Sequence, residues 1–306
     1  MDEATSSGYV VFEELLRKTG EFIAETLGTE QAFVTSGAAA AISLGTAAVL
    51  AGDDRDRMAS IPDTSGFDRN EFVFQRGHDY TYKRCFTLAG GKLVDVGRAD
   101  GCTVEEMEAG IGPKTAGIAY FESGRWGSEW VSLDQAREVA NKHGIKLVVD
   151  AAGQIYPLDQ FMRVARTGDV VAFGAKYIGS PHSTGICTGR AELVESAFLQ
   201  NFIGFELAGI QGLARPYGRP YKTDRGEVMG VAVALRRWFS MNHEERLAVE
   251  EDKRSAFARG LAGIAGVTTS IPKEAQLGPN VTVFIHFDAG ITGIDGHEVI
   301  KQLEEG

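Results

Sequence analysis

The sequence lacks any uninterrupted apolar run of about 18 residues, the length that a membrane-spanning helix requires. Its first residues, Met1-Asp2-Glu3, are acidic, whereas a secretory leader begins with basic residues. The chain has only 3 cysteines, and these are too far apart for a Cys-x-x-Cys metal motif or a disulfide framework. These absences predict a cytoplasmic protein that does not enter a membrane.

Positive charge is also scarce. The chain has 31 Lys and Arg residues against 42 Asp and Glu residues, and its formal net charge is −11. A surface of that charge repels a phosphate backbone, so binding of nucleic acid is disfavoured. The 6 histidines show no spacing typical of metal ligands, and we predict no bound metal.

Glycine, by contrast, is abundant. The chain has 38 glycines in 306 residues, about 12% against a usual value of about 7%. Glycine is common where the backbone turns sharply or approaches a ligand closely. A chain of this length can also bury a large core. Together these features favour an α/β enzyme.

Helical and strand-like segments alternate along most of the chain. Apolar periodicity predicts helices over residues 12–27 and 38–51, and possible capping boxes at 103–106 and 132–135 begin two more. Short apolar runs predict strands at 72–74, 92–96, 117–121, 146–149 and 170–173. This alternation predicts an α/β fold with a mostly parallel sheet that helices cover on both faces.

The last third of the chain differs. Residues 227–239 and 244–264 have the pattern of long helices, and one convincing strand follows at 281–287 before a final helix. We expect a large domain over residues 1–240, and a bridging helix with part of a small α/β domain over residues 241–306. Both ends of the chain look cut.

Two side chains at the ends of predicted strands can carry chemistry. Asp150 ends a buried strand, where α/β sheets bind ligands, although a loop aspartate that caps a turn is the alternative. Lys176 follows the next strand, among the small residues Gly174, Ala175 and Gly179. Small neighbours and apolar flanks favour a tucked amine whose pKa falls by desolvation, as a Schiff-base lysine requires, over a solvated surface lysine.

A third feature is the turn Ser36-Gly37, which leads into an alanine-rich helix at Ala38. Free backbone N–H groups and the helix dipole favour an anion there, although an ordinary serine N-cap is the alternative. No P-loop motif follows, and no Gly-x-Gly-x-x-Gly motif supports a nicotinamide dehydrogenase. A phosphate cradle, an acid for a pyridinium nitrogen and an amine for an aldehyde are what pyridoxal 5′-phosphate (PLP) requires.

Three blocks of sequence, at 150–157, 174–185 and 218–222, resemble the selenocysteine synthase-like branch of fold-type-I PLP-dependent enzymes. That branch contains L-seryl-tRNA(Sec) selenium transferase and the D-glucosaminate-6-phosphate ammonia-lyase type. The resemblance extends from about residue 20 to residue 287, and it implies an aminotransferase-like fold whose large domain binds PLP. Relatives often have a serine three residues before the lysine as a phosphate ligand, whereas this chain has Phe173.

The resemblance also implies a role for each site residue. Lys176 would hold PLP and take the Cα proton of the substrate, and Asp150 would bind the ring nitrogen. The other residues implied at the cofactor are Ser36, Gly37, Ala38, His78 and Ala152. His78 would stack on the ring, or is a surface histidine in a polar loop. Arg219 and Lys222 would bind anionic groups of the substrate, or belong to a solvated basic loop. A homodimer or a higher homo-oligomer is also implied.

The predicted reaction is a PLP-dependent α,β-elimination of the ammonia-lyase type. Its substrate would be a small amino acid or an amino-sugar acid such as D-glucosaminate 6-phosphate. One alternative is β-replacement, as in the selenium transferase, and another is a cofactor-free scaffold descended from such an enzyme. Because a chain of charge −11 offers no basic platform for a tRNA, we favour the small-molecule substrate.

Overall fold

The computed structural model describes residues 9–123, 126–207, 215–270 and 282–305. The chain divides into two compact units, Met1–Phe239 and Ser240–Gly306. Among the described residues, no helix combines the length and the apolar composition that a membrane span requires.

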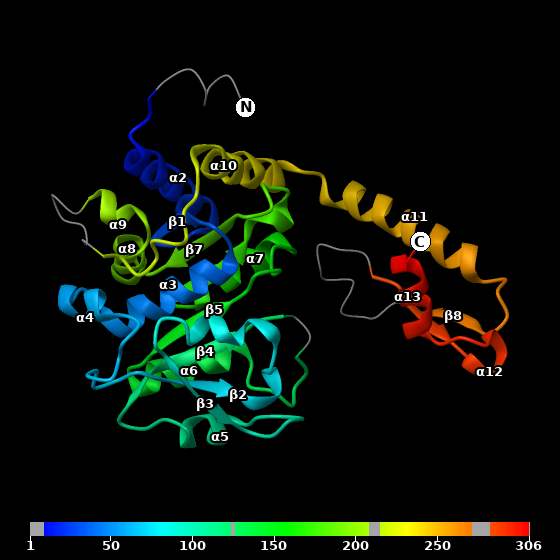
Figure 1. The fold of residues 1–306 in the computed structure, drawn as a ribbon, viewed down its shortest axis with the longest axis horizontal. Helices are drawn as coiled ribbons and strands as arrows, with labels where there is room; N and C mark the ends of the chain where they lie inside the picture. The colour runs from blue at the N-terminus through cyan, green and yellow to red at the C-terminus, as the bar shows by residue number, and fades with distance from the viewer. Residues whose placement is uncertain (1–8, 124–125, 208–214, 271–281, 306) are drawn as a thin grey trace. The chain divides into compact units, whose positions relative to one another are not determined.

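A seven-stranded sheet forms the centre of the first unit, in the order β1-β7-β6-β5-β4-β2-β3 (Figure 1). Its strands are β1 (Gln31–Thr35), β2 (Glu71–Gln75), β3 (Lys92–Val96), β4 (Thr115–Phe121), β5 (Lys146–Asp150), β6 (Val170–Gly174) and β7 (Gly185–Gly189). β7 runs antiparallel to β1 and β6, and the other neighbours are parallel. The predicted α/β fold with a mostly parallel sheet is confirmed. β7 was not predicted because glycine occupies both its ends.

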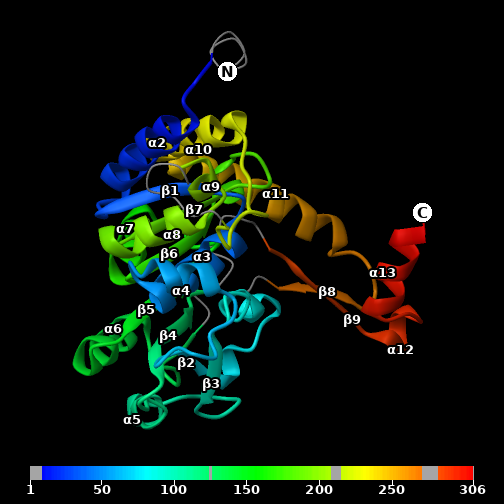
Figure 2. The ribbon, with the colours of Figure 1, turned by 60° about the vertical axis from the view of Figure 1, so that its left-hand side comes forward.

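Helices cover both faces of this sheet (Figure 2). One layer contains α2 (Phe12–Leu27), α5 (Val104–Ala109), α6 (Leu133–His143) and α7 (Leu158–Thr167). The other contains α3 (Ala38–Ala51), α4 (Arg55–Ser60) and α8 (Ala191–Gln200), with α9 (Ile203–Glu206) next to α8. α10 (Arg225–Ser240) packs on the first layer, where the Arg236 guanidinium lies 5.5 Å from the ring centre of Phe22.

Local signals in the sequence explain where these helices begin and end. The capping boxes at Thr103 and Ser132 both form. In each, the hydroxyl accepts a hydrogen bond from the backbone N–H of the residue three positions later, and the side chain of that residue accepts one from the backbone N–H of the capping residue. α2 and α6 end at Gly28 and Gly144, both left-handed, a conformation that glycine adopts without strain. α3 is apolar nearly all round because the sheet and α8 both cover it.

Asp169, which immediately precedes β6, fixes the amino-terminal edge of the sheet. Its buried carboxylate accepts hydrogen bonds from Arg190 (2.6 Å), Arg137 (2.8 Å) and the backbone N–H of Leu147 (2.6 Å). These bonds link β5, β6, α6 and the residue after β7. The carboxyl-terminal ends of β5 and β6 are thereby held in a fixed register.

The described residues of the second unit form a two-stranded antiparallel sheet and three helices. They are α11 (His243–Leu261), β8 (Val267–Ser270), β9 (Phe284–Phe287), α12 (Ala289–Thr292) and α13 (Gly296–Glu305). β8 was not predicted, because the run Val-Thr-Thr-Ser is short and polar. Among the described residues of this unit, no apolar side chain is buried. The hydrophobic core of the described chain therefore lies in the first unit.

Candidate active site

The predicted chemical groups lie at, or just after, the ends of β1, β5 and β6. Thr35 ends β1 and pairs with Gly185 of β7, and Gly185 pairs with Gly174 at the end of β6. Ser36 follows Thr35 directly, and Lys176 comes two residues after Gly174. The strand register thus brings the Ser36 turn and Lys176 to the same edge of the sheet.

Asp150 lies at this edge as well. It ends β5 and pairs with Ala172, two residues before the end of β6. The backbone N–H of Gly174 donates to the carbonyl oxygen of Ala152 (2.9 Å), so the chain after Asp150 stays beside β6. The carboxyl ends of strands in an open α/β sheet are where such folds bind ligands.

The carboxylate of Asp150 is enclosed, with 2% of the residue exposed. The hydroxyl of Tyr80 donates to its Oδ2 (2.6 Å), and the N–H of Ala152 donates to its Oδ1 (3.0 Å). The second of these bonds is the turn-capping contact that the sequence offered as an alternative. Burial raises the pKa of Asp150, and the two hydrogen bonds act in the opposite direction.

Lys176 is exposed on the short 3₁₀ helix η3 (Ala175–Ile178). Its Nζ lies 5.2 Å from the ring centre of Tyr177. The prediction that small neighbours tuck the amine away from water is therefore wrong for this chain. Alanine and glycine beside the lysine have too little side chain to cover it, so they leave it accessible.

His78 lies in the short 3₁₀ helix η1 (Arg76–His78) and is only 1% exposed. Its ring stacks on Trp126 (3.8 Å between ring centres, 11° between planes) and also contacts Tyr120 and Trp130. Burial lowers the pKa of His78 to about 3, so the ring is neutral near pH 7. The alternative of a surface histidine is wrong. In this arrangement an aromatic side chain already covers the ring that was predicted to stack on PLP.

The N-terminus of α3 is open. Gly37, not Ser36, is the N-cap, and no side chain caps it. The predicted alternative of an ordinary serine cap is therefore wrong, and the first N–H groups of α3, beginning with Ala38, retain their capacity for an anion. A Cβ on Gly185 would lie 2.4 Å from the carbonyl carbon of Gly37, so only glycine lets β7 approach this turn.

Arg219 and Lys222 are both exposed. The segment that carries them is tied to α3, because the hydroxyl of Tyr217 hydrogen-bonds that of Ser43 (2.7 Å). The guanidinium of Arg219 lies 5.5 Å from the ring centre of Phe205. Among the described residues, neither cation forms a hydrogen bond or an ion pair with Asp150.

Phe173 faces the core instead of the site. It is fully buried and packs edge-on against Phe161 of α7 (4.7 Å between ring centres, 70° between planes). The side chain at this position therefore supplies no oxygen to a phosphate. In the described residues, no cluster of three or more His, Cys, Asp and Glu side chains could hold a metal ion.

Sequence reasoning missed Tyr80. Its ring stacks on Phe121 at the end of β4 (3.9 Å, 3°), and its hydroxyl reaches Asp150 at the end of β5. A tyrosine in the polar segment after a predicted strand was the available signal. It did not indicate a partner, because Asp150 is 70 residues away along the chain.

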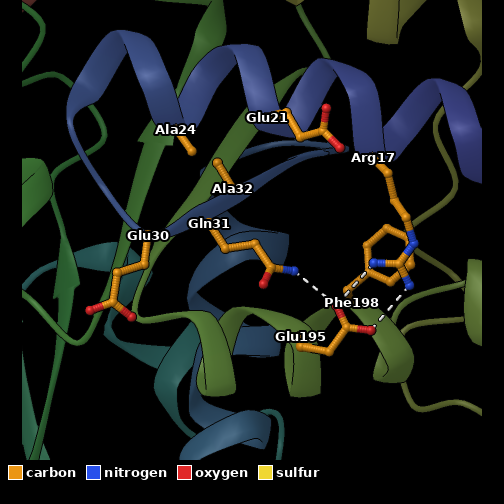
Figure 3. Close-up of a pocket in the computed structure, with 8 residues that line it drawn as sticks. All are labelled: Arg17, Glu21, Ala24, Glu30, Gln31, Ala32, Glu195 and Phe198. Atoms are coloured by element: carbon orange, nitrogen blue, oxygen red, sulfur yellow. Dashed lines mark hydrogen bonds and ion pairs between the residues drawn. The ribbon is translucent and has the colours of Figure 1, made fainter.

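A separate cavity of about 270 Å³ lies between α2, β1 and α8 (Figure 3). Arg17 binds Glu195 there through two hydrogen bonds (both 3.1 Å), and Gln31 donates to the same carboxylate (2.8 Å). Gln31 begins β1, whereas the Ser36 turn follows the end of that strand. Arg17 and Glu195 pair within this cavity, which contains none of the predicted site residues.

Solved structures define the class of this fold. The PLP-dependent protein YhfS of Escherichia coli has a TM-score of 0.58 at 12% identity, covering 90% of this chain and 65% of that one. D-Glucosaminate-6-phosphate ammonia-lyase has a TM-score of 0.78 at 27% identity, covering 99% of this chain and 78% of that one. The chain has the fold of fold-type-I PLP-dependent enzymes.

Two curated proteins are similar to the chain in sequence. D-Glucosaminate-6-phosphate ammonia lyase of Salmonella typhimurium is 29% identical, over 98% of this chain and 77% of that protein. 5′-C-Glycyluridine monooxygenase-decarboxylase of a Streptomyces species is 28% identical, over 97% of this chain and 72% of that protein. No family model matches the sequence. Both relatives are enzymes, and this protein is an enzyme as well.

Proposed function

We propose that the protein is a PLP-dependent ammonia lyase acting on a small 2-amino-3-hydroxy acid or amino-sugar acid, such as D-glucosaminate 6-phosphate. The observation that carries this proposal is the shared sheet edge, where the open N-terminus of α3, Asp150 and Lys176 lie together. Similarity to an ammonia lyase over nearly the whole chain supports the reaction and its substrate class.

The groups at this edge match the chemistry of PLP. A carboxylate suits a protonated ring nitrogen, and Asp150 keeps acceptor capacity because each of its oxygens accepts one hydrogen bond from the described residues. Uncapped N–H groups at Gly37 and Ala38 suit a phosphate, and the accessible amine of Lys176 suits an aldehyde. When bound, PLP supplies an electron sink for negative charge that develops at the substrate Cα.

Lys176 then has a second task. Its Nζ takes the proton from the substrate Cα as the Cα–H bond breaks. It then gives a proton to the hydroxyl on Cβ, which leaves as water when the Cβ–O bond breaks. Asp150 keeps the ring nitrogen protonated by holding a negative charge beside it. The water lost at Cβ is balanced by the water that hydrolyses the C–N bond. The products are a 2-keto acid and ammonia.

The branch of PLP-dependent enzymes and the oligomeric state are part of the same proposal. The blocks that resemble the selenocysteine synthase-like branch support a place in that branch, with the lyase reaction favoured over selenium transfer because the chain is acidic. Fold-type-I sites are commonly completed by a second subunit, so we include a homodimer. Sedimentation at micromolar concentration tests it.

A second candidate is oxidative decarboxylation of an amino acid. Identity to the monooxygenase-decarboxylase is nearly the same as to the ammonia lyase, 28% against 29%. The products distinguish the two reactions, because decarboxylation releases carbon dioxide and consumes oxygen, whereas elimination does neither.

The test incubates purified protein and PLP with a panel of 2-amino-3-hydroxy acids and amino-sugar acids. Ammonia release is followed together with oxygen uptake and carbon dioxide release. Ammonia without oxygen uptake is the expected result. Oxygen uptake with carbon dioxide supports the second candidate. A protein that binds no PLP, gives no visible absorption band and releases no ammonia is the cofactor-free scaffold.

Substitution of Arg219 tests whether it binds the substrate. Arg219→Met keeps apolar bulk and deletes the guanidinium, and a charge-assisted hydrogen bond contributes about 1.5–3 kcal/mol. We expect KM for a phosphorylated substrate to rise by about ten- to a hundredfold, with kcat little changed. Arg219→Lys restores part of the loss. The exposed Arg215→Met is the control. An unchanged KM assigns Arg219 to a solvated loop.

A further inference from the structure

Tyr80 is held rigidly across three neighbouring strand ends. Its ring stacks on Phe121, which ends β4, and lies parallel to Phe74 of β2 (6.5 Å between ring centres, 14° between planes). Its hydroxyl donates to Oδ2 of Asp150, which ends β5. Because β2, β4 and β5 are consecutive neighbours in the sheet, the position of this hydroxyl follows from the strand order.

The hydrogen bond is short. The distance of 2.6 Å between the Tyr80 oxygen and Oδ2 falls in the range of O–H···O⁻ bonds, about 2.5–2.7 Å, in which the acceptor is ionised. Tyr80 itself remains a donor, since burial and the charge of Asp150 both raise the pKa of its phenol. The phenol is therefore neutral and donates to the carboxyl group of Asp150.

Asp150 has little other support for its charge. Within the described chain, no lysine, arginine or histidine forms an ion pair with it. The thiol of Cys85 also interacts with it, and burial together with Asp150 raises the pKa of that thiol to about 11, so it carries no charge near pH 7. The Tyr80 hydroxyl and the Ala152 N–H are therefore the donors that oppose the cost of burying the carboxylate.

We propose that Tyr80 is a positioning residue, which holds Asp150 ionised and oriented so that its carboxylate can bind the protonated ring nitrogen of the cofactor. The cofactor part of this inference rests on the proposed function. The contact between Tyr80 and Asp150 does not. Tyr80 does not touch the reacting atoms and acts through Asp150.

Tyr80→Phe tests the inference, because it removes the hydroxyl and keeps the ring between its aromatic neighbours. Tyr82→Phe is the matched control, since Tyr82 lies in the short 3₁₀ helix η2 (Thr81–Phe86) that begins directly after Tyr80, contacts the Tyr80 ring and is 61% exposed. The first measurement is the dissociation constant of PLP, by titration of the visible absorption band. We expect it to rise about tenfold in Tyr80→Phe and to stay unchanged in Tyr82→Phe.

The second measurement needs no cofactor. Burial raises the pKa of Asp150 and the Tyr80 hydroxyl opposes that rise, so the pKa rises further in Tyr80→Phe. Ionisation of Asp150 therefore costs more free energy in the folded variant than in the folded wild type. The loss of unfolding free energy caused by Tyr80→Phe should therefore be smallest at acidic pH and increase as the pH is raised through the folded-state pKa of Asp150. A purely structural role gives a loss that does not vary with pH.

A double variant that combines Tyr80→Phe with Asp150→Asn tests whether Tyr80 acts through Asp150. In the Asp150→Asn background no carboxylate remains, so Tyr80→Phe should cause a loss of stability that is small and independent of pH. A loss that does not vary with pH in the wild-type background overturns the inference, as does PLP binding that is unchanged or tighter in Tyr80→Phe. If the wild type binds no PLP, the proposed function fails, while the unfolding series still decides the link between Tyr80 and Asp150.

Discussion

Lys176→Ala is expected to abolish the covalent attachment of PLP and nearly all of the activity. The substitution removes the amine that holds the cofactor and also the base that moves the Cα proton. Loss of positioned proton transfer alone costs about 10²–10⁴-fold in rate. The fold should persist, because Lys176 is exposed, and surface substitutions usually change stability by no more than about 0.5 kcal/mol.

Borohydride reduction followed by mass spectrometry of peptides measures this result. In the wild type the reduced cofactor should be found on the peptide that contains Lys176, and in Lys176→Ala on no peptide. Lys114→Ala is the control, because Lys114 is equally exposed but precedes β4, at the opposite edge of the sheet. Cofactor recovered on another lysine, such as Lys222, would remove Lys176 from the anchoring role.

Asp150→Asn is expected to retain PLP with weakened affinity and to lose most of its turnover. The amide keeps the shape of the carboxylate but provides no negative charge to keep a ring nitrogen protonated, so the electron sink weakens. Ammonia release under saturating PLP measures the loss. Near-wild-type turnover would exclude Asp150 from the mechanism. The exposed Asp100→Asn is the control for the loss of one negative charge.

The same variant should not lose stability at neutral and alkaline pH. Burial raises the pKa of Asp150, so ionising it costs the folded protein free energy as the pH rises through that pKa. The neutral amide of Asp150→Asn avoids this cost. In denaturant unfolding, the free energy of unfolding of the variant minus that of the wild type should therefore become more positive as the pH increases. A variant that loses stability steadily with increasing pH would contradict this sign.

The sequence by itself determined the class of fold. Periodicities of 2.0 and 3.6 residues report which residues a strand or helix buries, and the capping residues of α5 and α6 act within one turn, so these features are local. The sequence also indicated that Asp150 and Lys176 lie at the ends of strands and that the Ser36 turn leads into a helix. The strand register then brings the three to one edge of the sheet.

Only the tertiary structure decided what surrounds each of these groups. Small neighbours suggested a buried Lys176, but cover has to come from other segments, and in this chain it does not. His78 is enclosed by Trp126 and Trp130, which follow β4 rather than β2. The partner of Asp150 is Tyr80, because β2, β4 and β5 lie side by side. A pattern along the chain records which residues are apolar, whereas such contacts depend on which distant segments the strand order makes neighbours.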